Sequence, residues 1–262
     1  MTFDSLKFGA VDFIHKPSNR HASSLEGQYR AIIEKVTLAA AVEIGSVRLL
    51  RTANPSWQRD NAAARPEHLT HVCGVGASEG GYGPLLKIIP ALPRTLSAAI
   101  LLIIHDISQN VESFTRYLHR ESALRVQRAI DGAPVKPGVC YVASGREYVT
   151  LEREASGYGL RVNPSPFPNR RSSINMLLIS LAEGMRHRAM GLVLSGGGDD
   201  GAEGLREVAR RGGLAMVQSP AASLYKEMPR AALEQTPSAA VLPDRRIAEA
   251  IERHCPPGRW PE

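Results

Sequence analysis

Three polar residues that could act together in catalysis follow apolar segments of the sequence. Ser78 lies in a glycine-rich turn after one apolar run, His105 directly follows a second run, and Asp200 lies in the glycine-rich loop after a third. A serine hydroxyl is a weak nucleophile that needs an imidazole as base, and the imidazole needs a carboxylate that fixes its tautomer. These residue types predict acyl transfer through a serine, provided that the fold brings them together.

Each of the three residues also has a purely structural interpretation. Ser78 could cap the N-terminus of a helix, and His105 could be a strand-end histidine that bonds the backbone. Asp199 and Asp200 could cap a helix that begins near Ala202. The turn around Ser78 could equally cradle a phosphate or simply reverse the chain. Catalysis is favoured because all three residues follow strands of one predicted sheet, although spacing alone does not establish a triad.

The elements that must position these residues alternate between buried strands and amphipathic helices from residue 68 onward. Strands are expected at 72–75, 98–104, 139–143, 191–194 and 214–217, helices at 84–89, 111–118, 173–188, 202–211 and 229–235, and a hairpin from 148–151 and 158–162. Near-continuous apolar strands are typical of a parallel sheet that is covered on both faces. The predicted fold class is therefore α/β, with a doubly wound, mostly parallel sheet, helices on both faces and a small β-hairpin insertion.

Such a sheet binds its ligands beyond the carboxyl ends of the strands. Ser78, His105 and Asp200 all fall there, so we expect them to meet at one edge of the sheet. Their order along the chain is Ser, His, Asp. This differs from the Ser, Asp, His order of the α/β-hydrolases that are built on a Gly-x-Ser-x-Gly elbow.

The composition of the 262 residues, 43% hydrophobic and 22% charged, is that of a globular protein with a sizeable core. The formal net charge of +6 comes with dispersed arginines, which favours a mildly basic surface over a nucleic-acid site. Cys73, Cys140 and Cys255 share no metal or redox spacing, and no cofactor or metal is called for. Because we find no signal peptide and no apolar run long enough to span a membrane, we expect a cytoplasmic protein without membrane insertion.

The first 45 residues contain the end of a helix, a glycine turn, a short strand, a Lys16-Pro17 loop and a helix at 25–44. This pattern resembles the last strand and helix of a response-regulator receiver domain, in which the lysine that Lys16 matches contacts the phosphorylated aspartate. The acidic pocket of a receiver is absent, so an ordinary solvated lysine is the favoured interpretation of Lys16. We predict a receiver remnant at 1–45 and a linker at 46–67.

Five short motifs follow the linker in order: GASEGG at 76–81, IHD at 104–106, GVCYVASG at 138–145, LSGGGDDGAEG at 194–204 and EMPRAA at 227–232. Together they resemble the catalytic domain of the CheB-type chemotaxis protein-glutamate methylesterases. Five motifs in order are far more specific than any one of them. We therefore predict a methylesterase catalytic domain at 68–254, followed by a short tail at 255–262.

The resemblance implies that Ser78 is the nucleophile, His105 the general base and Asp200, rather than Asp199, the acid that orients the histidine. Ser78 would attack the methyl ester of a receptor glutamate, methanol would leave, and water would release the acyl-enzyme. The same acyl chemistry implies deamidation of receptor glutamines. The implied partners are the helical bundle of a methylated chemoreceptor and, through a full receiver domain, a histidine kinase.

Further residues around the implied triad match family positions. The backbone N–H groups of Glu79 and Gly197 are the implied oxyanion donors, and Arg171 and Met228 are the implied candidates for substrate binding. In the family, an intact receiver covers the esterase site until it is phosphorylated. A receiver remnant at 1–45 therefore predicts activity that is independent of a phosphodonor.

Several residues depart from the family pattern at the site itself, namely Glu79, Tyr82, Asp106, Gly197 and Glu227. Glu79 replaces a small residue beside the nucleophile, where a carboxylate could repel the developing oxyanion or point away and bind a cation. These departures keep an alternative open, a catalytically weak binding or regulatory module with the esterase fold. A dinucleotide dehydrogenase built on the glycines at 74–81 is less well supported, because no acidic residue follows a second strand to bind the ribose.

Overall fold

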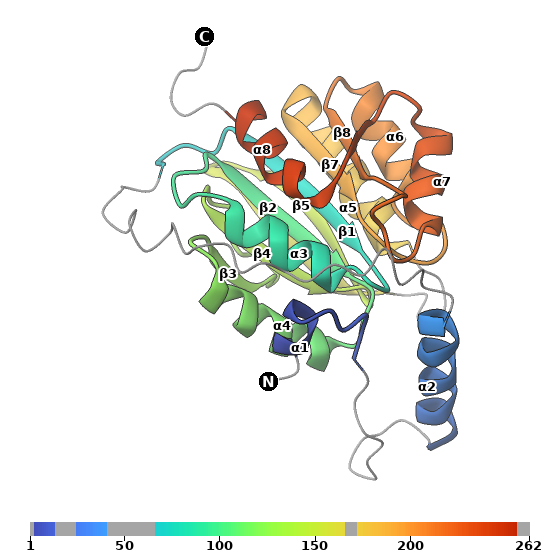
Figure 1. Cartoon of the computed structure of the whole chain (residues 1–262). Helices are drawn as coiled ribbons and strands as arrows, with labels where there is room; N and C mark the ends of the chain where they lie inside the picture. The colour runs from blue at the N-terminus through green and yellow to red at the C-terminus, as the bar shows by residue number, and fades with distance from the viewer. Residues whose placement is uncertain (1–2, 14–24, 41–65, 166–171, 256–262) are drawn as a thin grey trace.

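The computed structural model describes residues 3–13, 25–40, 66–165 and 172–255. Within them, seven parallel strands form one sheet in the order β3-β4-β2-β1-β7-β8-β9, and β5 and β6 form an antiparallel hairpin (Figure 1). The strands are β1 (His71–Ala77), β2 (Ala98–Ile104), β3 (Arg125–Arg128), β4 (Val139–Ser144), β5 (Glu147–Glu154), β6 (Gly157–Pro164), β7 (Ala189–Val193), β8 (Leu214–Gln218) and β9 (Ala240–Leu242). The helices are α1 (Asp4–Lys7), α2 (Leu25–Ala40), α3 (Tyr82–Ile88), α4 (Ser108–Glu121), α5 (Ser173–Met185), α6 (Ala202–Arg210), α7 (Glu227–Gln235) and α8 (Asp244–His254), with 3-10 turns η3 (Ile89–Ala91) and η4 (Arg186–Arg188).

Helices cover both faces of the sheet, which confirms the predicted fold class. One core cluster joins the sheet to α1, α3, α4 and α8, and a second joins it to α5, α6, α7 and the hairpin. All seven residues of β2 are buried because successive side chains point into one core and then the other. This double burial explains why the central strands are apolar throughout and could be identified from the sequence.

The strand β1 lies at the topological switch point of the sheet. The chain leaves β1 towards β2 and β4 on one side and later returns to β7 on the other side. Ala77, the last residue of β1, is in register with Ile104, the last residue of β2. In open α/β sheets a crevice forms where neighbouring strands lead in opposite directions, so the loops after β1, β2 and β7 surround one crevice.

The expected and observed elements differ at the margins of the fold. Neither the edge strands β3 and β9 nor the helix α8 was expected. The short strand expected before Lys16 is wrong for its described part, because residues 10–13 pair with no described strand and adopt no regular structure. The helix expected at 25–44 is observed over its described part as α2 (Leu25–Ala40), and residues 41–44 and Lys16 lie outside the described residues.

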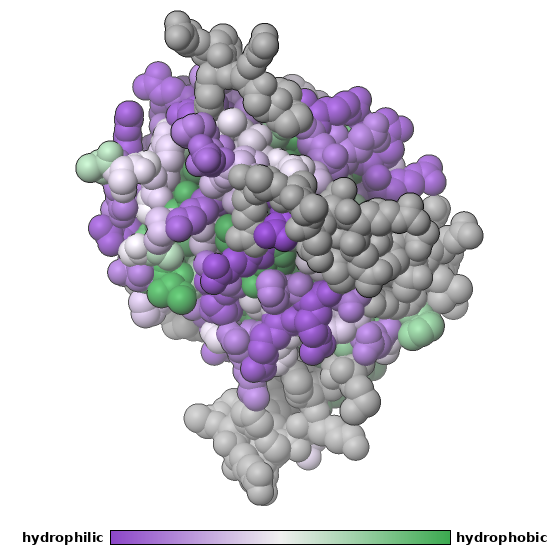
Figure 2. Space-filling view, turned by 90° about the vertical axis from the view of Figure 1, so that its left-hand side faces the viewer, coloured by the Kyte–Doolittle hydropathy of each residue, from purple (hydrophilic) through white to green (hydrophobic). Residues whose placement is uncertain are grey.

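The molecular surface is mostly hydrophilic on the face shown in Figure 2, where apolar areas are small and lie between polar side chains. Among the described helices, none is both long and apolar enough to cross a membrane. Cys73, Cys140 and Cys255 are buried free thiols, and burial raises the pKa of all three.

Candidate active site

Ser78 directly follows β1 and is buried, with only 2% of its surface exposed. Its backbone N–H donates to the Ser195 carbonyl (3.0 Å), and its own carbonyl accepts from the Gly81 N–H (3.0 Å). Gly80 has φ +72°, and a β-carbon there would lie 2.9 Å from Ser195 Oγ, so the turn requires glycine. The turn holds Ser78 at the carboxyl end of the sheet, beside the loop after β7.

His105 directly follows β2, just as Ser78 follows β1, and because Ala77 and Ile104 are in register the two residues begin neighbouring loops. Its backbone N–H donates to the carbonyl of Ala77, the last residue of β1 (2.9 Å). A β-carbon on Gly145 would lie 2.4 Å from His105 Cδ2, so the imidazole ring packs against the backbone just after β4. Gly145 therefore leaves room for the ring and limits where it can lie.

Asp200 orients His105 from the loop after β7. Its Oδ2 lies 2.9 Å from His105 Nε2 and accepts from the Ile174 N–H (3.0 Å), while Oδ1 accepts from the Asn175 N–H (2.9 Å). Both N–H groups belong to the first turn of α5, where unpaired donors and the helix dipole favour a carboxylate. Because the Asp200 side chain is only 1% exposed, these bonds compensate for its removal from water.

The position of α5 depends on glycines in β1. β-Carbons on Gly74 and Gly76 would lie 2.7 and 2.4 Å from side chains of α5, so the helix rests directly on the strand. Asn175 then ties the helix to the loop after β7, because its Oδ1 accepts from the Gly201 N–H (3.0 Å) and the Gly204 N–H (2.8 Å). Strand, helix and loop are thereby fixed to one another around Asp200.

The hydrogen bonds of His105 indicate which ring nitrogen is basic. Nε2 faces the Asp200 carboxylate, which only accepts, so Nε2 carries the hydrogen and Nδ1 keeps a lone pair. Ser173 Oγ lies 3.3 Å from the same Nε2. Nδ1 is buried and has no hydrogen-bond partner in the part of the chain that the structure describes. His105 is therefore arranged to accept a proton through Nδ1.

Ser173 was not identified from the sequence as a residue of the site. It is fully buried at the start of α5, and its hydroxyl approaches the same His105 nitrogen as Asp200. The signal that the sequence offered was its place in the segment 171–175 (Arg-Ser-Ser-Ile-Asn), where the helix expected at 173–188 begins.

The Glu79 carboxylate turns towards the nucleophile. Its Oε2 accepts from Ser78 Oγ (2.5 Å) and from the Gly197 N–H (3.0 Å). A backbone N–H beside a serine nucleophile is the type of donor that stabilises an oxyanion. Glu79 thus occupies the place next to the Gly197 N–H that a substrate carbonyl oxygen would need.

The loop after β7 packs on Met228 and binds a second carboxylate, that of Glu227 at the start of α7. A β-carbon on Gly196 would lie 2.2 Å from Met228 Sδ and 2.6 Å from Ser78 Cβ, so the loop is packed between these two side chains. Met228 is fully buried. Glu227 Oε2 accepts from the Gly198 N–H (2.8 Å). The remaining candidate for substrate binding, Arg171, lies outside the described residues.

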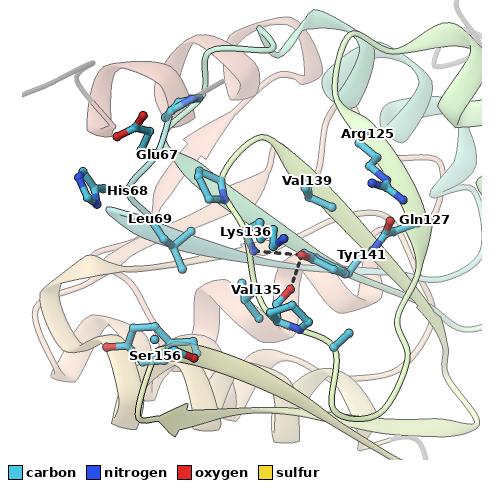
Figure 3. Close-up of a pocket in the computed structure, with 16 residues that line it drawn as sticks. Glu67, His68, Leu69, Arg125, Gln127, Val135, Lys136, Val139, Tyr141 and Ser156 are labelled. Atoms are coloured by element: carbon cyan, nitrogen blue, oxygen red, sulfur yellow. Dashed lines mark hydrogen bonds between the residues drawn. The ribbon is translucent and has the colours of Figure 1, made fainter. Parts of the chain in front are cut away.

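Two cavities differ in their relation to this site. One of about 510 Å³ is bordered by Asp200, Gly197 and the exposed side of the first half of α5. A larger one of about 1180 Å³ lies around Arg125, Lys136 and Tyr141, at the amino ends of β3 and β4 (Figure 3). Of Ser78, His105 and Asp200, only Asp200 lines the smaller cavity, which therefore lies at the same end of the sheet as the candidate site.

Comparisons with known proteins were made for sequence and for structure. A family model described as CheB methylesterase matches residues 73–251. The chain is 31% identical over 258 residues to protein-glutamate methylesterase/protein-glutamine glutaminase 1 of Xanthomonas campestris, covering 95% of this chain and 71% of that protein. It is 32% identical over 258 residues to the protein-glutamate methylesterase/protein-glutamine glutaminase of Pyrococcus abyssi, covering 96% and 69%. The crystal structure of the Thermotoga maritima CheB methylesterase catalytic domain matches with a TM-score of 0.66 and 28% identity, over 69% of this chain and 96% of that one.

Proposed function

The chain belongs to the CheB methylesterase family, and we propose that it is a serine hydrolase that removes methyl esters from glutamate side chains of a chemoreceptor. The observation that carries this proposal is the buried His105–Asp200 pair (2.9 Å) beside a buried serine at the switch point of the sheet. A buried imidazole that is held by a carboxylate next to a serine is the arrangement that acyl transfer through a serine requires.

The reaction starts when Ser78 Oγ attacks the ester carbonyl carbon and its proton passes to Nδ1 of His105. Asp200 holds Nε2 of the same ring and stabilises the imidazolium. The carbonyl oxygen becomes an oxyanion, for which the N–H groups of Gly197 and Glu79 are the donors. The imidazolium then returns the proton to the leaving oxygen, and methanol departs from the acyl-enzyme.

Water completes the cycle by the same route in reverse order. His105 takes a proton from the water, the resulting hydroxide attacks the acyl carbon, and Ser78 leaves with a proton from the imidazolium. The products are methanol and a glutamate carboxylate. A glutamine side chain that enters the same cycle releases ammonia in place of methanol, so the proposal includes deamidation of receptor glutamines.

The substrate that we propose is the helical bundle of a methylated receptor, and the proposed cellular location is the cytoplasm. The cavity of about 510 Å³ beside Asp200 and Gly197 offers a place for a side chain that projects from such a bundle. We also propose that residues 1–45 correspond to part of a receiver domain and 68–254 to the catalytic unit, with Arg171 at the substrate surface. Met228, which is fully buried, affects substrate binding indirectly, because it packs against the loop after β7.

A second candidate function is favoured by the contacts of Glu79. A carboxylate bonded to Ser78 Oγ and to the Gly197 N–H opposes substrate binding, as expected for a catalytically weak regulatory module with the esterase fold. The two functions differ in a measurable way, because the module binds a receptor without releasing methanol.

The experiment that separates them is methanol release from methylated chemoreceptor membranes. The chain, its Ser78→Ala variant and an established methylesterase are assayed in parallel. We expect release by the chain and none by Ser78→Ala, because the variant lacks the nucleophile. Release that survives in Ser78→Ala contradicts the assigned nucleophile, and receptor binding without release, while the established enzyme is active on the same membranes, favours the module.

A further inference from the structure

We propose that Glu79 is a tethered analogue of the reaction product, whose carboxylate occupies the oxyanion position in the resting chain and must be displaced by substrate. The inference rests on the proposed function, because the product of that reaction is itself a glutamate carboxylate. Glu79 brings the same chemical group, on the same side chain, to the nucleophile of its own chain. Because substrate must displace this carboxylate, Glu79 helps to determine which esters can react.

The exclusion of substrate follows from the hydrogen bonds of a single oxygen atom. Glu79 Oε2 accepts from both Ser78 Oγ and the Gly197 N–H. A backbone amide has one hydrogen, so the Gly197 N–H cannot serve Glu79 and an ester carbonyl at full strength together. After hydrolysis, the product carboxylate would place one oxygen at this same donor and beside the same hydroxyl. Glu79 therefore competes with substrate and imitates product.

A second observation, at His105, shows that the resting arrangement is incomplete. The His105 side chain is only 4% exposed, and its Nδ1 lacks a hydrogen-bond partner among the described residues, although a buried polar atom without a partner is costly. The Ser78 hydroxyl that should donate to it donates to Glu79 instead. Displacement of one carboxylate therefore frees the oxyanion donor and the nucleophile in the same step.

The side chain of Glu79 can leave without disturbing the fold. The residue is only partly buried, and its backbone carbonyl is held separately by Ser195 Oγ (2.9 Å). Glu227, the first residue of α7, also contacts this loop and accepts from the Gly198 N–H (2.8 Å). A β-carbon on Gly197 would lie 3.4 Å from a carboxylate oxygen of both Glu79 and Glu227. Repulsion between these two carboxylates makes the displacement of Glu79 easier.

Glu79 affects specificity because the energy that displaces it must come from substrate contacts away from the ester. A small ester has few contacts with which to displace Glu79, whereas a receptor bundle binds over a wide surface and can use that energy at the reacting group. Only the fraction of chains with Glu79 displaced reacts with a small reagent, so the apparent rate falls to that fraction of the rate of a chain without the Glu79 carboxylate. Glu79 thus selects large, well-bound substrates over small soluble esters.

The test is the rate at which a small fluorophosphonate, a reagent that needs both the serine and the oxyanion donors, labels Ser78 in the full chain. We expect Glu79→Ala to react at least about tenfold faster than the unchanged chain, and Glu79→Gln to show a smaller increase because its amide can still accept these bonds. Glu227→Gln removes a charge that lies against the same loop, from the first residue of α7, and should react no faster. Ser78→Ala should not be labelled.

A second readout uses the product analogue N-acetyl-glutamate α-amide as a competitor of labelling. It should slow the labelling of Glu79→Ala and have much less effect on the unchanged chain, in which the position is already filled. Equal labelling rates in the unchanged chain and Glu79→Ala would overturn the inference and leave the proposed function intact. Slower labelling of a folded Glu79→Ala would overturn the inference, because it would mean that Glu79 activates Ser78 as a base. Faster labelling of Glu227→Gln would overturn it as well, because it would mean that negative charge near the loop, and not occupation of the oxyanion position, slows the reaction. No labelling of any folded variant would overturn the inference and the proposed function together.

Discussion

Asp200 is the residue on which both the orientation of His105 and the local fold depend. Replacement by Asn keeps the shape but offers an amide, which can donate a hydrogen to Nε2 and so favour the wrong tautomer of His105. We expect Asp200→Asn to lower kcat by about 10³–10⁴-fold. Loss of the charge-assisted bonds from Ile174 N–H and Asn175 N–H should lower the free energy of unfolding by about 1–3 kcal/mol. Steady-state methanol release and urea denaturation measure the two effects.

The matched control is the neighbouring Asp199, which is exposed. Asp199→Asn removes the same charge from the same loop, and we expect kcat to stay within about twofold because exposed charges interact weakly. Equal losses in the two variants would mean that the loop charge, rather than the contact with His105, carries the effect.

Gly145 sets the position of the imidazole. A β-carbon there would lie 2.4 Å from His105 Cδ2 and 3.0 Å from His105 Cα. We expect Gly145→Ala to displace the ring and lower kcat by about 10²-fold, with a loss of about 1–3 kcal/mol of stability from overpacking.

The control for this prediction is Gly83 in α3, where a β-carbon would meet no atom within 4 Å. Gly83→Ala should leave kcat unchanged and stabilise by about 0.5–1 kcal/mol. Unchanged kcat in Gly145→Ala would contradict this role of the glycine.

At the level of residues, the sequence indicated which backbone positions are close together better than it indicated side-chain contacts. The expected closeness of His105 and Asp200 is observed at 2.9 Å, because both follow strands whose ends are fixed by the sheet. The direction of the Glu79 side chain could not be predicted, since it depends on a bond to the backbone of Gly197, more than one hundred residues away. Ser173 was missed for a similar reason, because its role follows from where α5 packs.

The helix α5 is the element that holds the site together, and its contact with β1 can be tested. A β-carbon on Gly76 would lie 2.4 Å from the branched side chain of Ile174, whose N–H donates to Asp200. We expect Gly76→Ala to push the first turn of α5 away, costing about 1–3 kcal/mol of stability and lowering kcat as well. Urea denaturation and methanol release on the same preparations test both.

A control for this prediction lies at the other end of α5. A β-carbon on Gly184 would come no closer than 3.5 Å to its nearest neighbour, which is ordinary contact. Gly184→Ala should therefore stabilise the helix by about 0.5–1 kcal/mol without changing kcat. The proposed role of α5 would be refuted if Gly76→Ala lost stability but kept full kcat.

At the level of elements, buried strands were predictable and marginal ones were not. Strands buried on both faces are apolar throughout, whereas β3 reads Arg-Val-Gln-Arg and is recognisable only by its pairing with β4. The helix α8 is highly charged, and only Ile247, Ala248 and Ile251 on one face are buried. That spacing is the one feature of the segment that indicates an amphipathic helix. The strand wrongly expected before Lys16 had a suitable composition and no described partner.

At the scale of the whole molecule, the first described segment packs into the same core as the catalytic elements. Phe3 and Phe13 are buried, and their rings lie 5.7 and 5.2 Å from the ring of Tyr82, which begins α3 just after the nucleophile turn. Tyr117 in α4 donates to Asp4 Oδ1 (2.6 Å). These contacts join residues far apart in the sequence, so division of the chain by composition alone could not anticipate them.

The stability of the whole chain should depend on pH through a histidine pair at the amino end of β1. His71 and His254 lie with ring centroids 5.2 Å apart, joining β1 to the end of α8. Burial, followed by His254, Arg188 and His187, lowers the pKa of His71 to about 4. Burial also lowers the pKa of His254. Both rings are therefore held neutral in the folded chain at a pH where the unfolded chain begins to protonate them.

The sign of the pH effect follows from these lowered pKa values. Between about pH 6.5 and pH 4 the unfolded chain binds more protons, so the free energy of unfolding falls as the pH falls. For half-buried His71 we expect a loss of about 1 kcal/mol between pH 7 and pH 5, after allowance for solvent screening. His71→Asn should flatten the dependence measured by urea denaturation at each pH, and the exposed His68→Asn should not. If both variants keep the slope of the unchanged chain, the acid sensitivity arises elsewhere in the molecule.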